Sequence, residues 1–169
     1  MSSGAQLVEQ ASAIMQDGLS DAGTLDKATS GAPAIETPFP AGNALALQLQ
    51  QIAKLIQARH ALGLTRQIFF ASLGGFDTHT NQLGDQDRLF SLLGPALEAF
   101  YQATVELGVA DQVTTFTESD FARTFKPNTN GGTDHAWGGH HVVLGGAVQG
   151  GRIVGELYAS CEPRSTAYV

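Results

Sequence analysis

One long helical pattern between two short apolar runs constrains the fold of this chain more than any other feature. The first run, RQIFFASL, covers residues 66–73 and ends at two glycines. The helical pattern covers 85–107, and the second run, VTTFT, covers 113–117. Apolar runs of this length beside helices are typical of buried parallel strands, and parallel strands need a crossover connection. The order therefore predicts an α/β fold with a mostly parallel sheet flanked by helices.

The chain before this unit divides into helical patterns and a polar connector. Residues 5–15 can form a short helix, and Gly, Ser, Thr, Asp, Ala and Pro dominate 18–42, which predicts an extended connector or surface loop. Asn43 is a favourable N-cap for a helix predicted over 44–62, whose apolar residues recur at helical spacing.

We therefore expect two parts. Residues 1–42 form an N-terminal helix and a Pro/Gly-rich connector, and residues 43–169 form an α/β domain. Within that domain Gly94 and Pro95 interrupt the second helical pattern, which predicts a kink or two abutting helices. A third apolar run covers 142–148, and the tail after Tyr158 shows no periodicity.

Composition excludes several classes of protein. Hydrophobic residues make up 43% of the 169 residues and charged residues 15%, which is typical of a globular domain. The net charge of −7 gives no basic surface for nucleic acid. Cys161 is the single cysteine, so an intrachain disulfide is excluded. The sequence contains neither a signal-peptide pattern nor an apolar run long enough to span a membrane.

Side chains that ligate metals gather in two clusters. The first, in GGFDTH, holds Asp77 and His79 just past the apolar run 66–73, and ligands of open α/β sheets bind where strands end. The second lies in the stretch 117–141, TESDFARTFKPNTNGGTDHAWGGHH, and contains Asp134, His135, His140 and His141. Carboxylates and imidazoles are ligands for zinc or manganese. We expect the two clusters to meet and to bind a divalent metal.

Each candidate ligand also has a structural alternative. Asp77 can form an Asx turn after the strand, and Asp134 fits a capping or turn role in TNGGTD. Adjacent His140 and His141 do not easily face one ion, so we expect one, with His140 favoured, to be a ligand and the other to support it or to pack.

The sequence also offers one candidate for anion binding and four hydroxyl candidates for a nucleophile. Arg123 can clamp an anionic group bidentately, or it can pair with Glu118 or Asp120 in a structural ion pair. No serine or threonine lies in a nucleophile-elbow context; the candidates are Ser72, Thr78, Ser119 and Thr133. A metal-activated water would make a side-chain nucleophile unnecessary.

Three motifs in order resemble the DUF1501 family. They are RQIFFASLGGFDTHTNQ, AFYQATVELGVADQVTTFTESDFART and NGGTDHAWGGHHVVLGGAVQGGRIVGEL, and together they extend over roughly residues 42–157. Members are bacterial, mostly uncharacterised, often exported by a twin-arginine signal, and related to the alkaline phosphatase and sulfatase superfamily. The resemblance implies an α/β sandwich with a metal site that cleaves phosphate or sulfate esters.

The resemblance also implies roles for individual residues. Asp77 and His79 resemble a carboxylate and an imidazole ligand of one metal, and Asp134 with His135 resembles the paired Asp-His of a two-metal site. His140 or His141 would be the last imidazole. Superfamily members are usually more than twice as long, and nothing in 1–40 resembles their first metal-binding Asp or their nucleophile. We therefore expect the C-terminal portion of such a protein.

Two functions from different classes follow. One is a metal-dependent hydrolase of small anionic phosphate or sulfate esters, or a fragment of one that lacks the nucleophile. The other is a non-catalytic metal-binding or interaction domain, and a fragment without activity is a third alternative. A sheet edge exposed by a missing N-terminal half would favour homo-oligomers.

Overall fold

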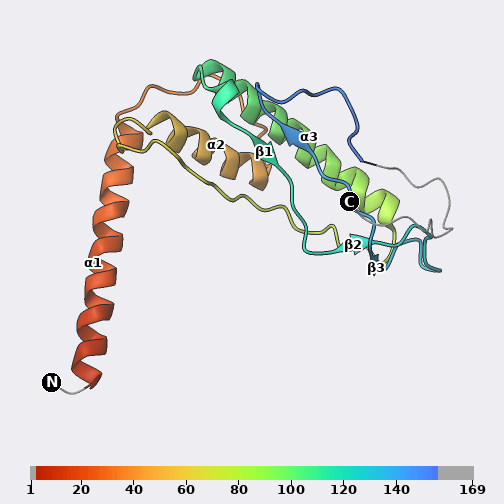
Figure 1. Cartoon of the computed structure of the whole chain (residues 1–169), viewed down its shortest axis with the longest axis horizontal. Helices are drawn as coiled ribbons and strands as arrows, with labels where there is room; N and C mark the ends of the chain where they lie inside the picture. Colours follow the sequence, from red (N-terminus) through yellow and green to blue (C-terminus); the bar gives the residue numbers. More distant parts are fainter. Residues whose placement is uncertain (1–2, 156–169) are drawn as a thin grey trace.

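The computed structural model describes residues 3–155, in which three helices dominate (Figure 1). Two of them, α2 and α3, lie together, and α1 projects away from them. The strands are two residues each, and a 3-10 helix, η1, follows α3. The bounds are α1 Ser3–Ser30, α2 Ala44–Gln57, α3 Gln82–Glu106, η1 Ala110–Gln112, β1 Thr115–Phe116, β2 Ala122–Arg123, β3 His135–Ala136 and β4 Val143–Leu144.

The start of α2 is fixed by Asn43, as the sequence predicted. The Asn43 Oδ1 atom accepts hydrogen bonds from the main-chain N–H groups of Leu45 at 3.1 Å and Ala46 at 3.2 Å. These bonds satisfy two of the donors that the first turn of a helix leaves free. Asn43 also donates from Nδ2 to the main-chain oxygen of Leu92 at 2.7 Å. The same cap therefore starts α2 and ties it to α3.

Small residues let α2 and α3 approach closely. Ala46 and Ala53 on α2, and Ala96 and Ala103 on α3, have no exposed surface. Larger side chains complete the core around them, including Leu45, Leu49, Ile56, Phe100 and Val109. The helix predicted over 44–62 ends earlier, at Gln57. α3 continues through Gly94 and Pro95 as a single helix, so the sequence does not divide into two abutting helices there.

The apolar run 66–73 is not a paired strand. Its residues alternate between the core and solvent, the period of an extended chain: Phe69, Ala71 and Leu73 pack against the core, whereas Ile68 is 95% and Phe70 89% exposed. The side-chain amide of Gln48 takes the place of a neighbouring strand at Ser72. Gln48 Oε1 accepts from the Ser72 N–H at 2.9 Å, and Gln48 Nε2 donates to the Ser72 carbonyl at 3.0 Å.

The predicted parallel α/β sheet is therefore wrong. In residues 3–155 the strands form two antiparallel pairs, β1 with β4 and β2 with β3. The run 113–117 supplies β1, and its partner β4 comes from the run 142–148, which returns in the opposite direction. Because the chain reverses between them without a crossover helix, the pairing is antiparallel. The fold is mostly helical.

The N-terminal region also differs from its prediction. α1 continues as a 28-residue helix to Ser30, so the extended connector predicted from Gly18 begins only after that residue. Gly18 and Gly23 lower helix propensity but do not end the helix. None of the helices in the described part of the chain is long and apolar enough to cross a membrane. The division into 1–42 and 43–169 stays a prediction, and the aperiodic tail after Tyr158 lies outside the described residues.

Candidate metal centre

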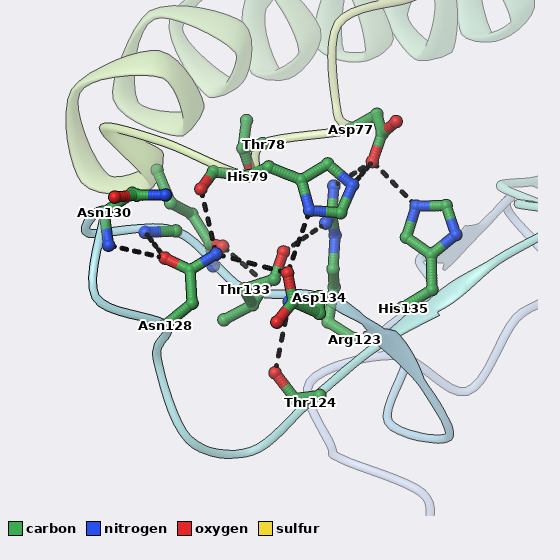
Figure 2. A network of polar contacts seen from close by, with 12 residues as sticks. Asp77, Thr78, His79, Arg123, Thr124, Asn128, Asn130, Thr133, Asp134 and His135 are labelled. Carbon is green, nitrogen blue, oxygen red and sulfur yellow. Dashed lines mark hydrogen bonds and ion pairs between the residues drawn. The ribbon is translucent and has the colours of Figure 1, made fainter.

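Main-chain hydrogen bonds bring the two predicted clusters together. The loop that carries Asp77 and His79 runs beside the loop 128–134 (Figure 2). The Thr133 N–H donates to the Thr78 carbonyl at 3.2 Å, and the Gln82 N–H donates to the Gly131 carbonyl at 2.9 Å. An isolated antiparallel bridge joins Thr80 to Gly131. These contacts hold two segments about 50 residues apart side by side, at one end of the molecule (Figure 1).

Gly132 makes this close approach possible. A Cβ atom built on Gly132 would lie 2.1 Å from the carbonyl carbon of His79 and 2.5 Å from the nitrogen of Thr80. Both neighbours are main-chain atoms, which cannot move away as a flexible side chain could. The space beside His79 therefore admits only glycine at position 132.

Asn128 organises the same loop through all of its side-chain polar atoms. Its Oδ1 accepts from the N–H groups of Asn130 at 2.9 Å and Gly132 at 3.1 Å. Its Nδ2 donates to the His79 carbonyl at 3.0 Å and to Asp134 Oδ1 at 3.2 Å (Figure 2). One amide thus shapes the turn and holds it against the loop that carries His79.

Three side chains present metal-ligating atoms to one point. Asp77, His79 and His135 each offer an atom, and these atoms all lie within 4.8 Å of one another. His79 Nε2 is 3.0 Å from Asp77 Oδ1, and His135 Nε2 is 2.7 Å from the same oxygen. His135 lies on β3, whose pairing with Arg123 on β2 fixes its position. The predicted meeting of the two clusters is therefore present in the structure.

Asp134 contacts His79 from the other side of the ring. Its Oδ1 lies 3.1 Å from His79 Nδ1, whereas His79 Nε2 faces Asp77. With a metal ion bound at Nε2, the Asp134 carboxylate would accept the proton on Nδ1 and hold the ring in that tautomer. Asp134 is thus placed to orient His79.

Aromatic stacking fixes the orientation of His135. The Phe121 ring lies 4.6 Å from the His135 ring at an interplanar angle of 8°, and the His79 ring lies 5.1 Å away at 27°. The stack of Phe121, His135 and His79 therefore restricts the orientation of both imidazole rings before any ligand binds. Sequence reasoning missed Phe121 because an aromatic residue in a polar stretch does not by itself indicate a ligand site.

Arg123 is anchored inside the site. Its NH1 donates to the Thr133 carbonyl at 2.6 Å, and its NH2 donates to the Phe76 carbonyl at 2.7 Å and to Asp77 Oδ1 at 2.8 Å. The side chain is 14% exposed and lies over the Phe121 ring. Its ion pair is with Asp77, not with the predicted alternatives Glu118 or Asp120, and it holds three segments together.

These contacts change the acidity of both carboxyl groups. The hydrogen bond from His135 holds the pKa of Asp77 below its ordinary value of 3.8, and the nearby charges of His79 and Arg123 add to the effect. The hydrogen bond from Asn128, followed by that from His79, lowers the pKa of Asp134. Both carboxylates therefore stay ionised and able to bind a cation throughout the physiological range of pH.

The remaining predicted residues lie outside this group. His140 and His141 are exposed and are not among the three residues whose ligand atoms converge, and His141 Nδ1 lies 3.5 Å from Thr117 Oγ1. The hydroxyl candidates Thr78 and Thr133 are buried, and Thr133 Oγ1 donates to Gln82 Oε1 at 2.6 Å. Ser119 donates to the main-chain oxygen of Phe121, and the Ser72 N–H is bonded to Gln48.

The cluster is open to solvent. The side chains of Asp77, His79 and His135 are 53%, 46% and 51% exposed. Two imidazoles and one carboxylate form the three-ligand set of catalytic zinc sites, in which water or substrate takes the remaining position. This group could hold a metal ion that a small molecule can reach.

Comparisons with known proteins agree with the motifs. The profile of one family, described as "Protein of unknown function (DUF1501)", matches residues 2–160. The match starts before residue 42, so it includes α1 as well as the three motifs. Neither the curated proteins nor the solved structures contain a significant match to the chain. Because the family profile extends over almost the whole sequence, this chain belongs to the DUF1501 family.

Proposed function

We propose that this chain binds one divalent metal ion through Asp77, His79 and His135, with Asp134 orienting His79. The observation that supports the proposal most directly is the convergence of three ligand atoms within 4.8 Å, supplied by a loop and by strand β3, which lie far apart in the sequence. Structural ion pairs also bring Asp and His together, but they do not require two imidazole nitrogens to face the same carboxylate oxygen.

The three ligand atoms fit around a metal ion if the distances between them increase slightly. Ligand bonds of about 2.0–2.1 Å in a tetrahedron separate neighbouring donors by about 3.3 Å. The nitrogen–oxygen distances of 3.0 Å and 2.7 Å are shorter than this separation by about 0.3 Å and about 0.6 Å. The contacts of Asp77 with His79, His135 and Arg123 converge on one oxygen, while its second oxygen points away from them in Figure 2. A modest rotation of Asp77 would open the space.

The ligand types favour zinc over manganese. Imidazole nitrogens suit zinc, whereas manganese prefers carboxylate, carbonyl and water oxygens. Arg123 lies on Asp77 and offsets part of the carboxylate charge, which weakens the attraction for any cation. Two neutral imidazoles depend less on that charge, so zinc would lose less affinity than manganese.

A more specific proposal is that the metal-bound chain hydrolyses a phosphate or sulfate ester. A metal in a three-ligand site polarises an ester oxygen or lowers the pKa of a bound water. The residues would hold that ion, and the half-exposed rim would leave room for a small anionic ester. Arg123 as an anion-binding residue belongs to this proposal, although its NH1 and NH2 already donate to three acceptors.

The experiment is a calorimetric titration of chelator-treated protein with zinc and with manganese. We expect one ion per chain and tighter binding of zinc, and His79→Ala and His135→Ala should each remove most of the affinity. His60→Ala is the matched control, because His60 is also exposed but lies just after α2. Unchanged zinc affinity in both site variants would refute the proposed ligands.

A second function, a non-catalytic metal-binding domain, is favoured by one observation. Thr78 and Thr133, the hydroxyl candidates nearest the ligands, are 4% and 8% exposed, and Thr133 is hydrogen-bonded to Gln82. An assay of the zinc-loaded protein with an aryl phosphate and an aryl sulfate separates the two functions. Turnover that His135→Ala abolishes supports the hydrolase, and stoichiometric zinc without turnover supports the binding domain.

A further inference from the structure

The helix α1 carries an apolar stripe that the rest of the described chain does not cover. Leu7, Val8, Ile14, Met15 and Leu19 are 66–72% exposed. The helix has 28 residues, about 42 Å in length, and projects away from α2 and α3 (Figure 1). Most of the stability of a helix in a protein comes from packing of its apolar face, so this stripe requires a partner surface.

The spacing of the stripe is that of a coiled coil. With Val8, Met15 and Ala22 at the first apolar position of each seven-residue repeat, the fourth position is occupied by Ala11, Gly18 and Leu25. The flanking positions add Leu7, Ile14 and Leu19. A repeat of 3.5 residues keeps one seam facing a second helix, so the partner surface is itself a helix.

We propose that α1 pairs with α1 of a second copy of this chain as an antiparallel two-helix coiled coil. This interface is independent of the proposed metal site, which lies at the other end of the molecule from the free end of α1.

Side-chain sizes are self-complementary in the antiparallel register. When Val8 of one copy faces Leu25 of the other, Met15 faces Gly18 and Ala11 faces Ala22. Each long side chain at the centre then meets a small one, as interdigitating packing requires. The same register aligns Ser3 with Ser30, so the two helices overlap along their whole length.

Charge also selects the antiparallel direction. The helix carries Glu9, Asp17, Asp21 and Asp26 against one lysine, Lys27. A parallel pair would place Asp21 against Asp26 of the partner helix on both sides of the seam, which is a repulsive contact. The antiparallel register instead places Asp21 beside Ile14 and Asp26 beside Ala5. It also brings the acidic half of each helix near the positive N-terminal end of the other.

An apolar surface at the C-terminal end of α1 can contact the N-terminal end of the partner helix. Leu25 lines an open pocket of about 270 Å³ together with Leu55, Leu62, Leu64 and Ile68. In the antiparallel register the apolar Leu7 and Val8 of the second copy would reach this pocket. A membrane surface fits less well, because interfacial helices carry Lys and Arg on their polar face and α1 is acidic.

The test uses the full 169-residue chain in sedimentation equilibrium over a concentration series. We expect a mass twice that of the 17.7 kDa chain at the higher concentrations. Met15→Glu should raise the dimer dissociation constant at least about 100-fold, because it buries an unpaired charge at the seam. Gln16→Glu adds the same charge on the outward face and should leave the constant within about threefold.

Disulfide cross-linking tests the direction. In a Cys161→Ser background, a mixture of Val8→Cys and Leu25→Cys chains should cross-link to one another, while Val8→Cys alone should not. A monomer at every concentration overturns the proposal. So does a dimer that Met15→Glu leaves intact, because its interface would lie elsewhere. Efficient cross-linking of Val8→Cys to itself overturns the antiparallel arrangement.

Discussion

At the scale of single residues, the site depends on the convergence of donors on Asp77. One of its oxygens lies within 3.0 Å of nitrogen atoms from His79, His135 and Arg123. Because these groups come from one loop and two strands, β2 and β3, Asp77 connects the parts of the chain that form the site. A divalent ion would replace the two imidazole contacts and keep the connection.

The orienting role of Asp134 can be tested without removing a ligand. Asp134→Asn keeps the size of the side chain and removes its charge, so it should weaken the preference for the His79 tautomer with Nε2 free. Partners of this kind typically contribute about 10–100-fold to metal affinity. Zinc titration should show a loss in this range, smaller than that of His79→Ala. A loss as large as that of His79→Ala would make Asp134 a ligand itself.

Gly132→Ala tests the close approach of the two loops. The added methyl group has no space beside the His79 main chain, so the loops must separate and the ligand atoms with them. We expect zinc affinity to fall although no ligand is changed. Gly139→Ala is the control, because its Cβ would lie 3.5 Å from the nearest atom, an ordinary contact. Equal zinc affinity in both variants would contradict this role of Gly132.

At the scale of elements, the pair α2 and α3 carries the stability of the fold. Ala103 is fully buried where α3 faces α2, whereas the preceding Gln102 is exposed. Ala103→Leu should destabilise the chain by about 1–3 kcal/mol, because the interface is already filled. Gln102→Leu adds a leucine to the same turn and should change stability by less than about 0.5 kcal/mol. Urea denaturation measures both, and equal stabilities would contradict the observed packing.

The end of α3 also anchors the segment before α2 through Glu106. Its carboxylate accepts from the Thr37 hydroxyl and from the N–H groups of Glu36 and Thr37, at 2.7 Å and 2.8 Å for the two N–H groups. These hydrogen bonds lower the pKa of Glu106 below its ordinary value of 4.5, and the bond from the Thr37 hydroxyl has the largest effect.

The sign of the resulting pH dependence follows from linkage. A carboxyl group whose pKa is lower in the folded chain stabilises the fold at pH values above its ordinary pKa, and the contribution disappears as the pH falls through the lowered value. Glu106→Gln should therefore lower the Tm at pH 7, and the difference from the parent should shrink as the pH falls below 4.5. A difference in Tm that does not change with pH would contradict the carboxylate anchor.

Helices were predicted better than strands, for a physical reason. The caps and apolar periodicity that define α2 and α3 are local, so Asn43 and the pattern over 85–107 located both helices. Strand pairing depends on a distant partner. The run 66–73 carries a strand-like composition, but in the described residues Gln48 and the helical core contact it, and no strand does.

At the scale of the whole molecule, the residues of the candidate site were easier to predict from the sequence than the fold around them. The clustering of Asp77, His79, Asp134 and His135 could be predicted because ligand chemistry is visible in residue type, and their role as metal ligands stays a prediction. Asn128 and Phe121 could not be predicted, since their roles arise from contacts that only the folded loops create. The predictions for His140 and His141 as ligands stay open, and so does self-association through a sheet edge.

The proposed metal site joins the loop that carries Asp77 and His79 to the strand β3 that carries His135. The measurement that tests it most directly is metal content by inductively coupled plasma mass spectrometry, on protein purified without chelator. Zinc, manganese and iron should be measured in the parent, in Asp77→Ala/His135→Ala and in His140→Ala/His141→Ala. We predict close to one ion per chain in the parent and in the His140/His141 variant, and almost none in the Asp77/His135 variant. An ion retained by the Asp77/His135 variant, or a parent that neither contains nor takes up metal, would contradict the central claim.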